Sequence, residues 1–506
     1  MVQPVSIRTS PLEQLDLLIR ARTPIIWVPT QEEERLENLV RSAARRLQDR
    51  LVMRWDFIGG LDAPSDRIGT ADRNPLAALD GLSTMAAGRG AILLLLDFHR
   101  FLEDAAVNRR LRNLAKELRR QPHTVIISAP NLSLPTELET TVSVLELPLP
   151  SGAEIRALLE GIASATGQPL PFDVSETLSR CCTGLPEERV RQIAARALAQ
   201  RGALGLDDQA DILEEKRQVV RRTELLEYCS TATNTTDIGG HDQLKRWLEQ
   251  RRLAFSPAAR AYGLPHPRGV LLLGPQGTGK SLTARAVAHS WGMPLLRLDV
   301  GRLFAGLVGA SEARTREMIR TTEAMAPCVL WIDEMDKGFG SDSRSDGGAS
   351  QRVLATMLTW MAEKESPVFV MATANGVDAL PAELLRKGRF DEIFLLDLPT
   401  LNERKEILRL HLTRLRPSQR GLDLDILAER CQGFSGAELE QVLVESMHLA
   451  FGDGGRPLKQ DDLLQAAAQL VPLSRTAAEQ LQALQQWAAS GRARPASSTA
   501  SWALDG

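Results

Sequence analysis

Short runs of consecutive apolar residues alternate with longer segments of helical periodicity along most of this chain. Runs that are apolar throughout are typical of strands buried on both faces of a parallel sheet. In the second half such runs lie at 270–273, 329–332 and 368–372, and a helical run covers 282–291. The pattern predicts an α/β fold in which helices flank a parallel sheet.

The first half of the chain shows the same alternation. Fragments recur in the same order, since 94–97 parallels 330–333 and 125–131 parallels 369–375. We therefore expect two copies of one fold. In the first copy the predicted strands are 24–29, 51–58, 91–96, 124–128 and 142–147, and the helices are 32–47, 153–166 and 187–200.

The strand at 270–273 leads into a glycine-rich loop. A strand, a G-x-x-x-x-G-K-[ST] loop and a helix indicate a phosphate site, because glycines let backbone N–H groups converge on an anion. Lys280 would reach the β- and γ-phosphates of a nucleotide, and Ser281 would hold Mg²⁺. The alternative is a glycine-rich turn that binds nothing. The loop comprises Gly274, Pro275, Gln276, Gly277, Thr278, Gly279, Lys280 and Ser281.

Polar residues follow the next two apolar runs. Asp333 and Glu334 come directly after 329–332, and Asn375 comes shortly after 368–372. Asp333 would position Mg²⁺, directly or through water, and Glu334 would orient or deprotonate an attacking water. The Asn375 amide could hold this water or the γ-phosphate. The alternatives are two solvated acids at a strand end and an ordinary turn residue.

Two arginines, Arg386 and Arg389, lie on either side of Gly388 in the segment 384–391. A guanidinium fork matches phosphate oxygens, so both could contact the γ-phosphate held by a neighbouring subunit. Surface salt bridges are the alternative, which the sequence alone favours.

The first copy lacks most of this chemistry. After its first strand, residues 30–34 read Thr-Gln-Glu-Glu-Glu, with no glycine cradle and no lysine. Three carboxylates there would repel a triphosphate. Asp97 is followed by Phe98, at a place where a hydrolytic site would carry a carboxylate. We expect a non-catalytic module that binds no nucleotide.

Composition restricts the partners. At 506 residues the chain is too long for a single core. Its net charge of −3 and the lack of a basic stretch interleaved with aromatic residues argue against nucleic acid. No apolar run reaches the roughly 18 residues of a membrane span. The five cysteines lack metal-ligand spacing, and an odd number fits a reducing compartment.

The order of these motifs resembles the AAA family of P-loop ATPases, over residues 237–475. The motifs are Ile-Gly-Gly at 238–240, the phosphate loop, Val-Leu-Trp-Ile-Asp-Glu at 329–334, Ala-Thr-Ala-Asn at 372–375, the arginine segment and Gly-Phe-Ser-Gly-Ala-Glu at 433–438. More narrowly, the degenerate first copy and the tail at 487–492 resemble a AAA group of cyanobacteria and plastid genomes. The resemblance implies Mg²⁺-dependent ATP hydrolysis by a homo-oligomeric, hexameric ring that acts on a protein partner. It implies a cytoplasmic protein, or a stromal one if plastid-encoded.

The resemblance also implies roles for individual residues. Asn375 would be a sensor of the γ-phosphate, and Arg386 and Arg389 would be arginine fingers for the next subunit. The adenine pocket would include Asp237, Ile238 and Gly239, and the nucleotide site would extend to Leu282, Gly436 and Ala437.

Two positions depart from the family pattern. Glu392 replaces the arginine that commonly follows Arg-Phe-Asp, which affects the expected subunit contact. At the place of the central pore loop, residues 307–309 read Leu-Val-Gly, and Leu307 offers less contact area than the usual aromatic residue.

These inferences give a domain plan and two competing functions. The first function is a ring ATPase that remodels a protein partner, and the second is a slow ATP-dependent switch that recruits partners through residues 1–205. Glu334 favours hydrolysis, because a pure binding module has no need of it. The expected parts are a degenerate AAA-like domain (1–205), a helical and polar linker (206–236), the ATPase large domain (237–398), a helical lid (399–475), and a C-terminal helix with a flexible tail (476–506).

Overall fold

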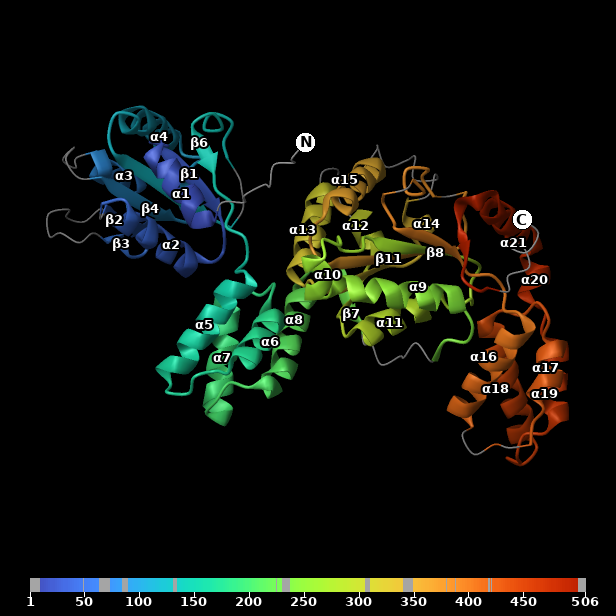
Figure 1. Cartoon of the computed structure of the whole chain (residues 1–506). Coiled ribbons are helices and arrows are strands. Elements are labelled where there is room, and N and C mark those ends of the chain that lie inside the picture. The colour runs from blue at the N-terminus through green and yellow to red at the C-terminus, as the bar shows by residue number, and fades with distance from the viewer. Residues whose placement is uncertain are drawn as a thin grey trace. The chain divides into compact units, whose positions relative to one another are not determined.

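The structure is a computed structural model with two compact units, Met1–Leu206 and Asp207–Gly506 (Figure 1). Each unit contains one sheet, of six strands in the first and seven in the second. The residues that the structure describes are 10–48, 50–62, 73–83, 90–130, 134–223, 225–229, 237–304, 310–339, 349–378, 380–386, 388–416, 419 and 421–498.

The first unit is a sheet with helices on both faces, followed by three further helices. Alternate residues of a strand point to opposite faces, so Ile26 and Val28 pack against α1 and α2, whereas Ile25 and Trp27 pack against α3 and α4. Its strands are β1 (Ile25–Pro29), β2 (Leu51–Asp56), β3 (Gly60–Asp62), β4 (Ala91–Leu96), β5 (His123–Ala129) and β6 (Val142–Val144). Its helices are α1 (Pro11–Arg20), α2 (Glu33–Arg46), α3 (Pro75–Ser83), α4 (Ala105–Leu118), α5 (Gly152–Ala165), α6 (Phe172–Cys182) and α7 (Glu187–Arg201).

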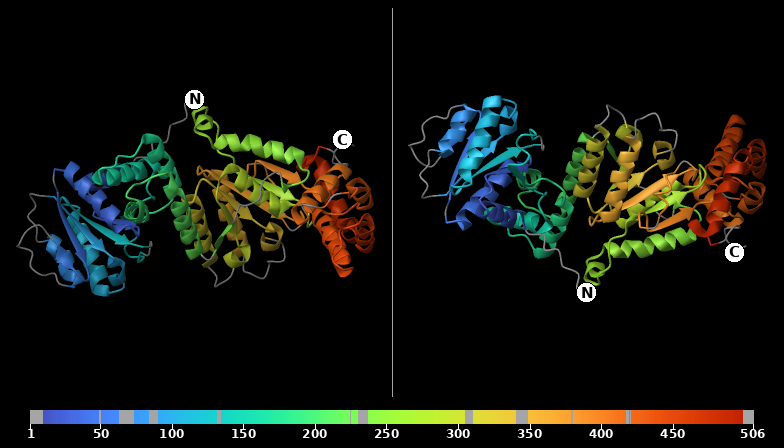
Figure 2. Two further views of the ribbon diagram at one scale, coloured as in Figure 1. Left: turned by 90° about the horizontal axis from the view of Figure 1, so that it is seen from below. Right: turned by 90° about the horizontal axis from the view of Figure 1, so that it is seen from above.

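The second unit begins with another sheet flanked by helices, and Figure 2 shows the strands of each sheet as a layer between helices. Its strands are β7 (Leu226–Cys229), β8 (Gly269–Leu273), β9 (Leu295–Leu298), β10 (Cys328–Ile332), β11 (Val368–Ala374), β12 (Glu392–Leu395) and β13 (Arg494–Pro495). The helices around this sheet are α8 (Gln209–Arg222), α9 (Asp242–Arg252), α10 (Pro257–Ala261), α11 (Lys280–Trp291), α12 (Val300–Phe304), α13 (Ala310–Ala324), α14 (Met335–Phe339) and α15 (Ala349–Glu363).

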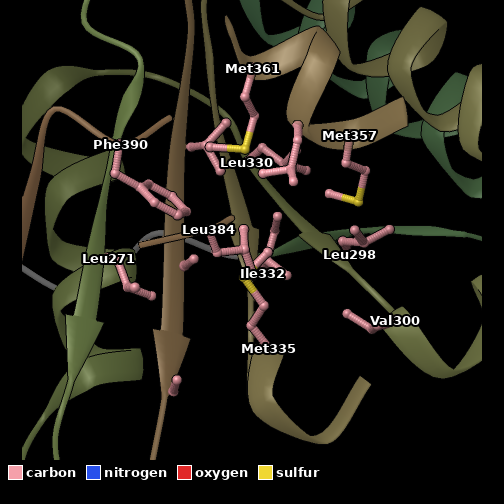
Figure 3. Close-up of a cluster of buried hydrophobic side chains, with 14 of the residues drawn as sticks. Leu271, Leu298, Val300, Leu330, Ile332, Met335, Met357, Met361, Leu384 and Phe390 are labelled. Carbon is pink, nitrogen blue, oxygen red and sulfur yellow. The ribbon is translucent and has the colours of Figure 1, made fainter. Parts of the chain in front are cut away.

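Buried side chains pack on both faces of this sheet. Leu271 and Ile332 point into a cluster with methionines of α14 and α15, which Figure 3 shows in close-up. Val270 and Trp331 point to the other face, toward α9 and α11. Because both faces are buried, the central strands β8, β10 and β11 are buried at every position, which explains their continuous apolar runs.

Helices after β12 form a separate small domain and the end of the chain. Their shared core includes Leu408, Leu427, Leu443 and Leu463. The first turns of α16 and α18 are closed by capping boxes, Thr400 with Glu403 and Ser435 with Glu438. These helices are α16 (Leu401–Leu415), α17 (Leu424–Arg430), α18 (Gly436–Gly452) and α19 (Gln460–Gln469), followed by α20 (Leu473–Thr476) and α21 (Ala478–Trp487).

The two sheets share one strand order, which confirms the α/β class and the duplicated fold. In the first unit the order is β3-β2-β4-β5-β1-β6, and in the second it is β7-β9-β10-β11-β8-β12, with β13 as an additional outer strand beside β12. All pairs within these orders are parallel except for the outer strands β3 and β7, which are antiparallel to their neighbours. Each unit therefore brings the carboxyl ends of five strands to one edge.

Two backbone hydrogen bonds that bracket the central strand pair fix the correspondence between the units. They are Val125 N to Pro24 O (2.9 Å) and Thr30 N to Ala129 O (2.8 Å) in the first unit, and Val370 N to Arg268 O (3.0 Å) and Gly274 N to Ala374 O (3.2 Å) in the second. They align Ser128 with Thr373, and Pro130 rather than Asn131 with Asn375. Asn131 itself lies outside the described residues.

The same correspondence corrects the predicted equivalence of Asp97 and Asp333. Leu95 pairs with Ile127 as Ile332 pairs with Ala372, so Leu96 takes the place of Asp333. Asp97 then takes the place of Glu334, and both have left-handed backbones, with φ of 53° and 49°. At this strand end the first unit has therefore lost the predicted metal ligand and kept an acid at the predicted hydrolytic position.

The turn after β1 is filled by the protein itself. Only residues 30–32 separate β1 from α2, whereas 274–279 separate β8 from α11. The Glu32 carboxylate accepts a hydrogen bond from the backbone N of Glu187 (2.6 Å) at the start of α7, and another from Arg35 (3.0 Å). Arg35 also donates to the carbonyl of Pro148. The turn that would have to hold a phosphate at the start of α2 instead binds the start of α7 through Glu32.

Two segments differ from the predicted domain plan. Within the predicted linker, Leu226–Cys229 is not helical but forms β7, antiparallel to β9. In the predicted flexible tail, Arg494–Pro495 forms β13, parallel to β12. Both strands are short and find their partner far along the chain, so local periodicity does not reveal them. Residues 499–506 lie outside the described part.

Residues 1–206, expressed alone, should show no rise in melting temperature with Mg²⁺ and ATP. Residues 30–32 are too few to form a phosphate loop, and ligand stabilisation requires a site. Differential scanning fluorimetry checks this, with residues 207–506 as the positive control. A concentration-dependent rise for the first unit would contradict the interpretation of residues 30–34.

Candidate functional site

The glycine-rich loop joins β8 to α11 at the carboxyl edge of the second sheet. Gly277 and Gly279 have left-handed backbones, with φ of 79° and 91°. At Gly277 a Cβ atom would lie 2.9 Å from Ser435 Oγ and 3.0 Å from Ala437 Cβ. The loop therefore needs glycine both for its conformation and for its close contact with the start of α18.

Lys280 is the first residue of α11 and is 8% exposed. Its ammonium donates hydrogen bonds to the carbonyls of Gly274 (2.6 Å) and Pro275 (2.7 Å). Burial lowers the pKa of Lys280 to about 8, against the opposing effect of the nearby carboxylates Asp336, Asp333 and Glu334. A phosphate in the loop would favour the charged form, because it is an opposite charge in a buried place.

The hydroxyl of Thr373 on β11 connects the two acids that follow β10. It donates to Asp333 Oδ1 (2.7 Å) and accepts from the backbone N of Glu334 (3.0 Å). Ser281 Oγ lies 3.5 Å from the same Asp333 oxygen. Two strands and one helix thus hold a hydroxyl and a carboxylate side by side.

Glu334 is held in an ionised form. Lys337 Nζ lies 2.8 Å from Glu334 Oε2, and this hydrogen bond is the main cause that lowers the pKa of Glu334. The Asn375 amide lies 3.5 Å from Glu334 Oε1. The backbone N of Asn375 donates to Asp336 Oδ2 (3.1 Å), which fixes the end of β11. An ionised carboxylate beside an amide donor is an arrangement that can accept a proton from water.

A pocket of about 390 Å³ extends from these groups to the helical domain. It brings together most of the residues expected from the sequence. Gly274 and Pro275 contribute the carbonyls that hold Lys280. The predicted residues that line the pocket are Asp237, Ile238, Gly239, Gln276, Gly277, Thr278, Gly279, Lys280, Ser281, Leu282, Asp333, Glu334, Asn375, Gly436 and Ala437.

The segment 237–240 approaches α16 closely at the far end of the pocket. At Gly239 a Cβ atom would lie 2.5 Å from Ile407, and at Gly240 it would lie 2.3 Å from Glu403. Gly240 also has a φ of 73°. Both glycines are therefore required where the large domain meets the lid.

Several residues near the pocket were missed by the sequence analysis. Thr373 lies inside the Ala-Thr-Ala-Asn motif, but nothing local reveals that it bridges two acids. His241 follows Gly240, and its Nε2 lies 3.0 Å from the carbonyl of Thr278. His411 and Glu403 line the pocket from α16. Burial lowers the pKa of His411, although Glu440 lies 3.7 Å away.

Arg386 and Arg389 are not among the described residues that line this pocket. The nearby Asp391 carboxylate accepts from the backbone N of Arg268 (2.8 Å) and Gly269 (3.1 Å), at the amino end of β8. The phosphate loop begins at the opposite end of this strand, roughly 16 Å away at strand spacing. The arginine segment is therefore anchored on the far side of the domain from its own phosphate loop.

The two departures from the family pattern, Glu392 and the pore loop, differ in how much the structure shows of them. Glu392 forms an ion pair with Arg494 of β13 (2.8 Å), which gives this departure from the family pattern a partner within the chain. The pore-loop residues 307–309 lie outside the described residues. In the described part of the chain, no helix has the length and apolar character needed to cross a bilayer.

The donor set at the strand edge fits a magnesium ion. Ser281 and Asp333 offer hard oxygen ligands, and Mg²⁺ in nucleotide sites uses one or two protein oxygens with phosphates and water. Within the described ranges, no three His, Cys, Asp or Glu side chains gather into a protein-only metal site.

Both units of the chain match models of AAA ATPase domains. Residues 270–398 match the model described as ATPase family associated with various cellular activities (AAA), and residues 421–465 match the AAA+ lid domain. Residues 11–147 and 153–223 match the N-terminal and second domains of SpoVK-like AAA ATPases.

Some similar proteins match nearly the whole chain, and others match only part of it. This chain is 46% identical to a protein of Trieres chinensis called "Uncharacterized AAA domain-containing protein ycf46", over 96% of this chain and 98% of that one. The protein with this description in Guillardia theta is 44% identical, over 96% of each chain. The ATP-dependent zinc metalloprotease FtsH of Thermus thermophilus is 37% identical, over 46% of this chain and 38% of FtsH.

Thr373→Val should separate binding from the reaction expected of Asp333 and Glu334. Valine keeps the shape but removes the hydroxyl bridge, so turnover of ATP should fall about 10–100-fold, as for other residues that support ligands. Binding of ADP without Mg²⁺ should stay unchanged. Steady-state kinetics and calorimetry measure the two quantities.

Thr322→Val is the matched control, because its buried hydroxyl donates to the Met318 carbonyl within α13. Parent-level turnover in Thr373→Val would show that the bridge does not support the acids.

Proposed function

Because the chain belongs to the AAA family of ATPases, we propose that it hydrolyses ATP in a ring and uses the energy to remodel a protein partner. The hydrolytic part of this proposal rests on Glu334. This carboxylate is ionised, lies at the end of a buried strand, and is within 3.5 Å of the Asn375 amide. A module that only binds nucleotide has no need of such a group.

Different residues of the pocket would hold different parts of the nucleotide. Backbone N–H groups of residues 276–281 and the Lys280 ammonium would hold the phosphates, and Asp237, Ile238 and Gly239 would contact the base. Lys280 is ready for this because it need only exchange two loop carbonyls for phosphate oxygens. Ser281 and Asp333 would hold Mg²⁺, which when bound would neutralise phosphate charge.

Glu334 would take the proton of the attacking water. Its ion pair with Lys337 lowers its pKa further below neutral pH, where a general base must be ionised, and occupies one of its two oxygens. Asn375 would orient the water or the γ-phosphate through its amide. Thr373 would keep Asp333 and Glu334 in register, so that metal ligand and base act on the same phosphate.

The ring is supported by the position of the arginines. Arg386 and Arg389 lie shortly before Asp391 in the chain. The Asp391 carboxylate is bound at the amino end of β8, away from the phosphate loop of the same subunit. In a head-to-tail ring such a surface faces the next subunit. An arginine supplied in this way stabilises charge on the transferred phosphoryl group.

A slow ATP-dependent switch is the second candidate. It is favoured by the first unit, which keeps the fold although only residues 30–32 join β1 to α2, too few for a phosphate loop, so that this unit would serve a purpose other than nucleotide binding. In that function the first unit would recruit partners according to the nucleotide state of the second.

Glu334→Gln should bind ATP but hydrolyse it about 10²–10⁴-fold more slowly, because the amide cannot accept a proton. Lys280→Ala should instead lose ATP binding itself. Turnover and equilibrium binding of ATP distinguish these results. Glu445→Gln, at an exposed position of α18, is the matched control.

Parent-level hydrolysis by Glu334→Gln would place the base elsewhere. If the parent protein binds ATP but turns it over only slowly, and partner capture follows the nucleotide state, the switch is the better description.

Mixing Glu334→Gln with Arg389→Ala subunits should restore part of the activity that each lacks alone. A mixed interface pairs an intact Glu334 with an intact Arg389, and an arginine finger contributes roughly 10³–10⁵-fold. Parent activity should also rise more steeply than linearly with protein concentration. Activity that is strictly proportional to concentration, without rescue on mixing, would show that the arginines serve only the fold.

A further inference from the structure

A segment near the end of the described residues is hydrogen-bonded to three elements around the nucleotide pocket, namely β12, α9 and α16. Residues 494–498, named here the C-terminal strap, begin as β13 beside β12. The backbone N of Ala496 then donates to the carbonyl of Leu395 (3.0 Å), and Ala496 is only 1% exposed. The strap is therefore held at the sheet edge by backbone hydrogen bonds and by burial.

The strap also caps helix α9. The carbonyl of Ala496 accepts from the backbone N of Gln243 (3.0 Å) and Leu244 (3.1 Å), in the first turn of that helix. The N-cap residue His241 supplies no side-chain hydrogen bond there. The backbone N of Ser498 donates to Asp242 Oδ1 (2.8 Å). Because residues 237–240 lead directly into α9, the strap fixes the segment that forms one end of the pocket.

Glu403 connects the strap to the lid. Its carboxylate accepts from the Ser497 hydroxyl, from the backbone N of His241 (3.2 Å), and from both the backbone N and the hydroxyl of Thr400 (2.9 Å each). Glu403 lies on α16 and lines the pocket. One side chain thus joins the strap, the segment before α9 and the lid helix.

We propose that the C-terminal strap positions the base-binding end of the nucleotide site, by holding residues 237–241 and the lid helix α16 in register. The inference rests on the proposed nucleotide site. The strap touches neither the phosphate loop nor Asp333, Glu334 or Asn375 through any hydrogen bond described above. It should therefore set the affinity for the nucleoside part of the ligand and leave phosphate binding and chemistry unaltered.

The test compares two C-terminal truncations of the protein, one without the strap and one that retains it. Removal of residues 494–506 deletes it, and removal of 499–506 is the control that keeps it. The probes are ADP, which has a base, and tripolyphosphate, which has none. Loss of the strap should raise the Kd for ADP about tenfold or more and raise KM for ATP, while the Kd for tripolyphosphate and kcat at saturating ATP stay within twofold.

Equal weakening of both probes would overturn the proposal, because it would indicate general damage to the site, as would an unchanged ADP affinity. If the larger deletion fails to fold, Ser497→Ala carries the test, since it removes only the hydroxyl that reaches Glu403. It should weaken the binding of ADP about threefold to fivefold and leave the binding of tripolyphosphate unaffected. Equal ADP affinity in Ser497→Ala and in the parent protein would contradict the proposed role of the strap. A parent protein that binds ADP but does not hydrolyse ATP would refute the proposed activity without affecting this comparison, which needs only binding.

Discussion

The parallel pairing of β8, β11 and β10 is the constraint on which the site depends. Parallel strands end at the same edge, so the phosphate loop, Asn375 and the Asp333–Glu334 pair meet there although they are far apart in sequence. The Thr373 hydroxyl then reaches across from one strand to the next. The buried, apolar strands give these polar groups a rigid base.

The two units show that this framework does not by itself make an ATP site. Their strand order is the same, and Ser128 lies where Thr373 lies. Differences at the carboxyl edge bear on the site: residues 30–32 are too few to form a phosphate loop, and Leu96 takes the place of Asp333, the proposed metal ligand. Glu32 satisfies the start of α7 from within. Fold and chemistry are thus separable, because the core depends on the strand interiors and the site on their ends.

The second unit completes its pocket with segments from distant parts of the chain. Residues before α9 contact α16, the phosphate loop contacts the start of α18, and the strap joins the sheet edge to both α9 and α16. The lid is therefore linked to the large domain by glycine contacts and by Glu403. A pocket formed between two such domains can respond to its ligand by a change in their relative angle.

The sequence alone predicted the buried strands β8, β10 and β11, most strands of the first unit, the duplicated α/β fold, the glycine-rich loop and the two carboxylates after β10, because each is encoded in a short apolar run or a fixed local spacing. It did not reveal β7 and β13, since each is stabilised by a strand far away in the chain. It also misaligned Asp97 by one residue, because only hydrogen-bond register shows which acid faces which strand. The roles of Thr373, Glu403 and residues 494–498 were decided by the tertiary structure, since each follows from hydrogen bonds between segments that are remote in sequence and adjacent only in the folded chain.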